Sequence, residues 1–272
     1  MAELNQAAQA AQAARAARRP FSWSAGQKAL LLITAAYCAW SLAHMGVSGE
    51  RLADGWRQGA KFLASMFPPE LGKMDELWQG IKETLQIAVL ATAAGLALSL
   101  PVGLMAAANL SPAPLRLAGR TLIAACRALH PVISAILFVK AVGFGPLAGI
   151  LALVVATVGF VGKLFADAIE EISPKPIEAI RATGASFANV VLFGVLPQVT
   201  TRFVGFATYQ LDSNLRNSTM VGIVGAGGIG GALFSAFLRY EYGFVCTILA
   251  TVIAIIVLGE VAVNAVRKAL DV

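Results

Sequence analysis

The sequence predicts an all-α, polytopic membrane protein with about six transmembrane helices of roughly 20 residues each. Of its 272 residues, 58% are hydrophobic and only 13% are charged, and the mean hydropathy is +0.73. A soluble domain carries about 25% charged residues, so this composition argues against a soluble enzyme and a disordered protein. The formal charge of +6 does not indicate a nucleic-acid binder, because no dense basic patch exists outside the N-terminal tail.

The apolar residues are gathered into stretches long enough to cross a bilayer, which needs about 20 residues. We expect six spans, at roughly 28–45, 78–108, 118–142, 147–168, 199–221 and 243–266. Pro101 is expected to kink the second span, because proline removes a backbone hydrogen bond from a helix.

These spans divide the chain into a first transmembrane helix and a core. We expect a cytoplasmic tail at 1–27, the first helix at 28–46, an outer amphipathic connection at 47–77, a core of five helices at 78–268 and a short tail at 269–272. The long inner loop of the core covers 170–197. A transit peptide is the alternative interpretation of the N-terminal tail.

Cytoplasmic loops of membrane proteins collect Lys and Arg, and their placement predicts both termini in the cytoplasm. The inner segments carry Arg15, Arg18, Arg19, Lys28, Arg116, Arg120, Lys175, Arg181, Arg202, Arg267 and Lys268, and the outer ones Arg51, Arg57, Lys61, Lys73 and Arg239. In the outer connection, Leu52, Trp56, Gly59, Leu63 and Met66 recur at helical spacing, which predicts an interfacial helix.

Small and apolar residues otherwise dominate the motifs. Cys38, Cys126 and Cys246 each lie in an apolar stretch and read as buried hydrophobes. Gly225, Gly227 and Gly230 match G-x-G-x-x-G, but a dinucleotide site needs a preceding strand and further parallel strands. We therefore interpret the glycines, Gly228 included, as a re-entrant turn lining a pathway, or as a tight helix contact.

Charges inside membrane spans usually face a cavity or a partner. Arg127 and His130 are three residues apart on one face, shortly before Ser134. Arg216 lies in a polar run that suits the passage of an oxyanion, although a pair with Asp212 four residues earlier is an equal alternative. Lys163 and Asp167 can pair in the same way. The candidate pathway residues are Arg127, His130, Ser134, Asn214, Arg216, Asn217, Ser218 and Thr219.

The inner loop carries the most informative motif. Pro174 and Pro176 end the fourth span, a short helix restarts, and Gly184 allows a turn. The run from Glu178 and Ala179 through Gly184 to Leu196 and Pro197 resembles the EAA loop of ABC-importer permeases. Ile180 and Gly194 depart from that motif, and the loop as a whole, which ends at Gln198, is similar to the phosphonate-type branch.

Two further stretches resemble the same branch, and together the resemblance covers about residues 60–268. One runs from Phe67-Pro68-Pro69-Glu70 to Asn109-Leu110-Ser111-Pro112, and the other is the 212–219 run leading into the glycines. His130-Pro131-Val132-Ile133-Ser134 departs from the family, which commonly has a Pro-Glu and a Trp there.

The resemblance implies a type I, methionine-importer-like fold and a transport subunit that is not an enzyme. It implies a bacterial inner-membrane importer that carries phosphonate, phosphite, hypophosphite or a similar phosphorus oxyanion into the cytoplasm. A second permease subunit, an ABC ATPase dimer and a periplasmic binding protein are the expected partners, beside the lipid bilayer. The expected residues for ATPase coupling are Glu178, Ala179, Arg181, Gly184, Leu196 and Pro197.

No cofactor is expected in this chain, because it has no G-x-x-x-x-G-K-[ST] phosphate loop. ATP and Mg²⁺ are expected in the partner ATPase. The alternatives are an ABC permease for another small substrate, and an ion-coupled secondary transporter or channel. The sequence leaves open the identity of the anion and whether the two permease subunits are identical.

Overall fold

The computed structural model describes residues 24–46 and 48–269. The chain forms two compact units, residues 1–63 and 64–272. Most of the predicted N-terminal tail, with Arg15, Arg18 and Arg19, lies outside the described residues, as do residues 270–272 of the predicted C-terminal tail.

The first unit holds helix α2 (Ala25–His44) and most of helix α3 (Gly49–Ser65). Ser24 begins α2 with a capping box, in which its hydroxyl accepts from the Gln27 amide at 3.3 Å and the Gln27 side chain accepts from the Ser24 amide at 2.9 Å. This satisfies two amides that have no partner within the helix. Neither helix buries a residue, so their apolar side chains are open to the surroundings.

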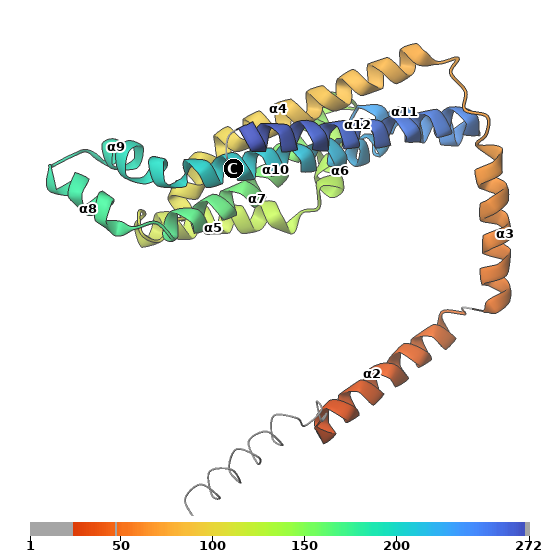
Figure 1. Cartoon of the computed structure of the whole chain (residues 1–272), viewed down its shortest axis with the longest axis horizontal. Helices are drawn as coiled ribbons and strands as arrows, with labels where there is room; N and C mark the ends of the chain where they lie inside the picture. Colours follow the sequence, from red (N-terminus) through yellow and green to blue (C-terminus); the bar gives the residue numbers. More distant parts are fainter. Residues whose placement is uncertain (1–23, 47, 270–272) are drawn as a thin grey trace, which may run out of the picture. The chain divides into compact units, whose positions relative to one another are not determined.

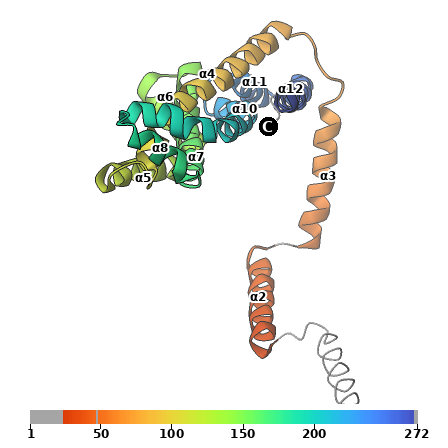
Figure 2. The ribbon, with the colours of Figure 1, turned by 60° about the vertical axis from the view of Figure 1, so that its left-hand side comes forward.

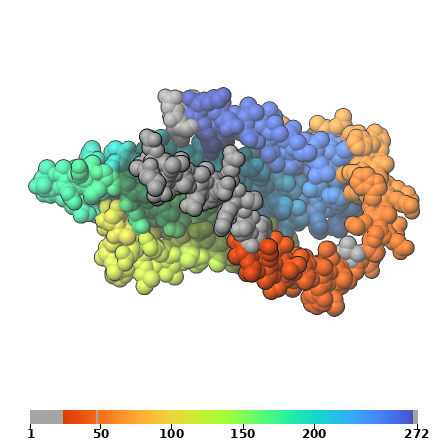
Figure 3. Space-filling view, turned by 60° about the horizontal axis from the view of Figure 1, so that its bottom comes forward, coloured from red at the N-terminus to blue at the C-terminus, as the bar shows by residue number. Residues whose placement is uncertain are grey.

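The second unit is a helical bundle in which α4, α7, α10 and α12 run side by side (Figures 1 and 2). Helix α8 lies at one end of the bundle, which we call the α8 end, and α11 lies at the other. In the space-filling view the α8–α9 segment projects from the bundle (Figure 3). The elements are α4 (Met74–Ala106), α5 (Ala113–Ala128), α6 (Pro131–Val142), α7 (Pro146–Glu170), α8 (Pro174–Ala182), α9 (Phe187–Asn189), a π-helical segment η1 (Val190–Val195), α10 (Leu196–Ile223), α11 (Ile229–Leu238) and α12 (Tyr242–Ala269).

Four of the described helical segments are long and apolar enough to cross a membrane alone, namely Met74–Ala106, Pro146–Glu170, Phe187–Ile223 and Tyr242–Lys268. Two bent pairs, α2 with α3 and α5 with α6, bring the number to six if each pair is one span. The all-helical, polytopic fold class predicted from the sequence is confirmed.

The third predicted span, residues 118–142, is bent at Pro131. Helices α5 and α6 meet at an angle of 92°. Pro131 is the first residue of α6 and cannot donate to the preceding turn. His130 occupies the N-cap, where its Nδ1 accepts from the Val132 amide at 3.3 Å. One of the amides that lack a partner at the start of α6 is thereby hydrogen-bonded.

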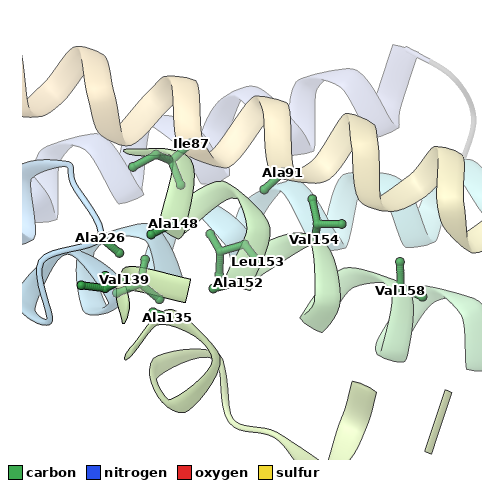
Figure 4. Packing of buried hydrophobic residues seen from close by; sticks show 11 residues of the cluster. Ile87, Ala91, Ala135, Val139, Ala148, Ala152, Leu153, Val154, Val158 and Ala226 are labelled. Atoms are coloured by element: carbon green, nitrogen blue, oxygen red, sulfur yellow. The ribbon is translucent and has the colours of Figure 1, made fainter. Parts of the chain in front are cut away.

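A core of small and branched residues lies where α4, α6 and α7 meet (Figure 4). Ile87 and Ala91 of α4 face Ala148 and Leu153 of α7, and all four are fully buried. Ala226, which follows α10, closes the same cluster from the glycine-rich turn. The core therefore joins the first long helix of the bundle to the turn that precedes α11.

Helices α4 and α7 touch through glycine. A Cβ on Gly95 would lie 2.5 Å from the Cβ of Thr157, and one on Gly103 would lie 2.6 Å from the Phe165 ring. Real carbon atoms do not approach so closely, so only glycine allows this helix separation. These contacts set the distance between the two central helices.

We predict that Gly95→Ala destabilises the bundle by about 1–3 kcal/mol, the usual cost of overpacking a tight core. The measurement is the thermal unfolding midpoint of the purified protein in one detergent. The control is Gly55→Ala in α3, where an added Cβ meets nothing within 4 Å. The control should leave the midpoint unchanged or slightly higher, and equal midpoints for both variants would contradict a tight α4–α7 contact.

Candidate coupling helix and transport route

Helix α8 is a short, sharply bounded helix at the α8 end of the bundle. Pro174 occupies its first position, where the missing amide costs no hydrogen bond. It ends at Ala182, and two residues later comes Gly184, whose φ of +76° is left-handed and whose amide donates to the Arg181 carbonyl at 3.0 Å. An added Cβ at Gly184 would meet nothing within 4 Å, so the backbone conformation and not space requires glycine here.

One face of α8 packs on the bundle and the other is open. Ile177 is buried. Ile180 packs against Gly194 of η1, where an added Cβ would lie only 3.3 Å from the Ile180 side chain. Glu178, Ala179 and Arg181 are exposed. The helix therefore presents polar and small side chains on a surface that nothing in the described chain covers.

Gln198, at the start of α10, fixes α8 to the bundle. Its side-chain oxygen accepts from the Ser173 amide at 3.2 Å, and its Nε2 donates to the Gly194 carbonyl at 2.6 Å. Leu196 is half-buried beside it and Pro197 is exposed. The sequence showed Gln198 only as the end of the motif, and its bonding role required the fold.

The end of α7 is fastened in the same region. Glu170 accepts from Arg120 at 2.6 Å and from the Ala108 amide at 2.8 Å. Glu171 pairs with Arg202 of α10 at 2.5 Å. These bonds fasten the end of α7, directly before α8, to α5 and α10.

The polar run of α10 is divided by the fold. Asn214 is completely buried, and its amide donates to Thr92 of α4 at 2.9 Å and to Thr157 of α7 at 3.0 Å. Gln210 donates to the same Thr157 hydroxyl at 3.1 Å. These side chains hold three helices together in this conformation.

The bonds given for the other side chains of this run are made within α10 itself. Arg216 pairs with Asp212, as the i,i+4 alternative predicted, and half of the Arg216 side chain stays exposed. Ser218 is completely buried and donates to the Leu215 carbonyl at 2.8 Å. Asn217 and Thr219 are half-buried. A substrate contact for these residues stays a prediction.

The glycine-rich turn follows α10 and precedes α11, a short helix that the sequence did not predict. Gly225, Gly227 and Gly228 have φ values of +88°, +80° and +81°, which favour glycine. A Cβ on Gly230 would lie 1.9 Å from the Thr219 carbonyl oxygen. The glycines thus form an irregular turn and a tight helix contact at different positions, and their place along a pathway stays a prediction.

Two side chains of α4 hold this turn, and sequence reasoning missed them. Glu83 accepts from the Gly228 amide at 2.9 Å, and Thr84 accepts from the Ile229 amide at 2.8 Å. They satisfy two of the free amides at the start of α11, and the carboxylate also suits the positive end of the helix dipole. Since the bonds join residues 145 apart in sequence, no local pattern could have indicated them.

Two cavities lie at opposite ends of the bundle. One of about 410 Å³ lies beside the glycine-rich turn and is lined by Glu76, Gln79, Gly80, Glu83, Phe144, Gly145, Pro146, Gly225, Gly227, Gly228, Gly231, Ala232 and Ser235. The other, of about 260 Å³, lies between α5 and α7 and includes Arg127. His130 caps α6 and Ser134 is buried, so neither is joined to Arg127 by a described contact.

Residues 99–271 match the family described as "Binding-protein-dependent transport system inner membrane component". This chain belongs to that family. Phosphite transport system permease protein PtxC of Stutzerimonas stutzeri is 36% identical over 244 residues, which cover 89% of this permease and 88% of PtxC. Phosphate-import permease protein PhnE of Mycolicibacterium smegmatis is 41% identical over 193 residues, and the match covers 70% of this permease but only 36% of that protein.

The permease also resembles a solved transporter. A chain of the MetNI methionine ABC transporter, in an inward-facing conformation, superposes with a TM-score of 0.64 at 26% identity. The match covers 74% of this permease and 98% of that chain. The methionine-importer-like fold expected from the EAA-type loop is confirmed.

An ion cluster joins the first turn of α4 to the start of α12, at the end opposite α8. Glu241 accepts from Lys73 at 2.5 Å and from Arg239 at 3.1 Å, and Arg239 also reaches Glu76 at 3.4 Å. The hydrogen bond from Lys73, with that from Arg239, holds the pKa of Glu241 below its usual value. The bond to Glu241 likewise raises the pKa of Arg239.

We predict a pH dependence from this cluster. A carboxylate whose folded pKa is lowered stabilises the fold above its unfolded pKa of about 4.3, and this contribution disappears as the pH falls through the folded value. When the pH is lowered below about 4.3, the thermal unfolding temperature of the purified permease should therefore decrease. The decrease should be smaller for Glu241→Gln. Asp75→Asn is the control, since Asp75 has no described ion pair, and identical pH profiles for Glu241→Gln and the unchanged protein would contradict the cluster's role.

Proposed function

We propose that this permease is the membrane subunit of an ATP-driven importer that moves a phosphorus oxyanion from the periplasm to the cytoplasm. The observation that carries the proposal is α8, an exposed helix whose N-cap residue Ser173 is bonded to Gln198 of α10, beside the Glu171–Arg202 pair, in the position and pattern of an EAA-type loop. An ABC ATPase dimer, which binds ATP and Mg²⁺, would bind the exposed face of α8. A second permease subunit and a periplasmic binding protein would complete the assembly.

The substrate class follows from the relatives. PtxC is named for phosphite, HtxC of the same organism is named a putative phosphite permease at 35% identity, and PhnE2 of Escherichia coli is named a putative cryptic phosphonate permease at 40% identity. The cations on the helices of the bundle, among them the exposed Arg127 and Arg216, agree with an anionic cargo. We therefore propose phosphonate, phosphite, hypophosphite or a similar oxyanion.

The orientation follows from the distribution of Lys and Arg. With α8 in the cytoplasm, Arg116, Arg120, Lys175, Arg181 and Arg202 lie on the same side of the membrane, as positive residues of short loops do. This places the glycine-rich turn and the Lys73–Glu241 cluster on the periplasmic side. Both termini of the chain are then cytoplasmic.

One specific alternative is a different small substrate, because the fold matches the methionine transporter and a probable D-methionine permease, MetI of Vibrio cholerae, is 31% identical over 119 residues. The ion-coupled alternative has less support, because the family is defined by dependence on a binding protein.

Uptake by the whole importer tests the substrate. The permease is reconstituted in liposomes with its cognate ATPase and binding protein, and ATP-dependent uptake of labelled phosphite, phosphate, methylphosphonate and methionine is compared. We expect import of at least one phosphorus oxyanion and none of methionine. Methionine uptake, or uptake without ATP, would overturn the proposal.

Gly184 gives a sharp test of coupling through α8. We predict that Gly184→Val loses ATPase association and uptake, because a left-handed conformation costs a residue with a Cβ about 1–2 kcal/mol, and a β-branched one more. Gly184→Asn is the matched variant, since asparagine tolerates this conformation, and it should keep most of both. The measurements are co-purification of the ATPase and ATP hydrolysis stimulated by the binding protein.

A valine variant that behaves like the asparagine variant in both assays would show that the turn after α8 is not needed for coupling.

A further inference from the structure

The 260 Å³ cavity between α5 and α7 has an unusual wall for a membrane bundle. It is lined by Ala106, Arg120, Ile123, Ala124, Arg127, Lys163, Ala166 and Asp167. Half of these residues are small or branched apolar residues, and three of the other four are cations. Charged groups within a membrane protein are retained where they face a cavity or a partner.

The charges around this cavity do not balance. Arg120 pairs with Glu170 at 2.6 Å, and Lys163 is bonded to Asp167 on the next turn of α7. Arg127 forms no ion pair with any carboxylate in residues 24–46 and 48–269. One guanidinium therefore has no carboxylate partner, beside two cations that each have one.

Glycine sets the position of Arg127. A Cβ on Gly159 of α7 would lie 2.9 Å from Arg127 Cγ and 3.0 Å from its amide nitrogen. The absence of that atom lets the stem of Arg127 lie directly on α7. Lys163 is one turn further along the same helix, so Arg127 and Lys163 share one wall of the cavity although they are 36 residues apart.

This arrangement replaces the one that the sequence predicted. Spacing on α5 suggested that Arg127 acts with His130, but the His130 ring caps α6 at the 92° bend. The fold instead brings Arg127 together with Lys163 and Arg120. Three cations on two helices can surround a small anion, which two residues on one helix face cannot.

We propose that this cavity binds a tetrahedral phosphorus oxyanion through Arg127 and Lys163, with Arg120 at its rim. A guanidinium fork donates two parallel hydrogen bonds to such a group, and an ammonium adds a point charge. Arg127 is exposed and the Lys163 side chain is 43% exposed, so both cations are open to an incoming anion. Asp167 competes for Lys163, which keeps the site weak enough to release its ligand.

Two kinds of ligand carry such a phosphorus oxyanion. One is the free oxyanion on its way to the cytoplasm, and this source rests on the proposed function. The other is the phosphate of an anionic lipid headgroup, because basic pockets between helices on the cytoplasmic side of a membrane hold such groups. The second source does not depend on what the importer carries.

The experiment uses the permease–ATPase complex without the binding protein, in a phosphate-free detergent, with the nucleotide sites filled by ADP. In the first arm, binding of inorganic phosphite is measured by equilibrium dialysis. In the second arm, phosphatidylglycerol is titrated into the micelles, and native mass spectrometry counts the lipids retained. Both arms compare the unchanged complex with Arg127→Gln and with Lys140→Gln, a control that removes a cation from the far end of α6.

We expect Arg127→Gln to weaken one of the two probes by about tenfold or more, the loss expected for a charge-assisted hydrogen bond, while Lys140→Gln weakens neither. Loss in the phosphite arm identifies the free oxyanion, and loss in the lipid arm identifies the headgroup. If Arg127→Gln does not assemble, Arg127→Lys serves instead, and keeping the charge without the fork should weaken binding several-fold. Equal binding of both probes by the unchanged complex and the Arg127 variants, or no binding by the unchanged complex, would overturn the proposal.

The outcomes separate this inference from the proposed function. A complex that imports methionine but loses phosphatidylglycerol on Arg127→Gln contradicts the function and supports the site. A complex that imports phosphite but binds both probes equally in every variant supports the function and contradicts the site.

Discussion

The side chain of Thr157 is the contact on which the bundle depends. Its Cβ fills the space that Gly95 leaves on α4, and its hydroxyl accepts hydrogen bonds from Asn214 at 3.0 Å and Gln210 at 3.1 Å on α10. A buried amide without partners would cost several kcal/mol, so the three helices must keep this register. The glycine contact and the polar network act at one point, and each constrains the same helix separation.

From that point, α10 runs to both regions of functional interest. Its first turn carries Gln198, which bonds α8, and the residues that follow its last turn form the glycine-rich turn held by Glu83 and Thr84. On the proposed function, a movement of α8 would be passed along α10 to the turn at the opposite end. The hydrogen-bonded crossing at Thr157 would act as the fixed point of that movement, because it ties α10 to both α4 and α7.

Ion pairs between different elements lie at the two ends of the bundle. Arg120–Glu170 and Arg202–Glu171 fasten the α8 end, and the Lys73–Glu241–Arg239 cluster fastens the other. Between them, Arg127 of α5 and Lys140 of α6 form no ion pair within the described residues. Exposed pairs contribute little stability individually, so the end clusters are better understood as fixing geometry, whereas the Arg127 guanidinium at the cavity is exposed and open to a ligand.

The sequence by itself determined the membrane class, the approximate spans, the left-handed glycine after α8 and the family resemblance, because these depend on composition, on apolar length and on short motifs. It also gave the Lys163–Asp167 and Arg216–Asp212 pairs, which are fixed by helical spacing. Only the tertiary structure decided the 92° angle of the bend at Pro131, the existence of α11, the burial of Asn214 and the meeting of Arg127 with Lys163. These depend on contacts between residues far apart in the chain, and a local pattern cannot specify which helix faces will meet.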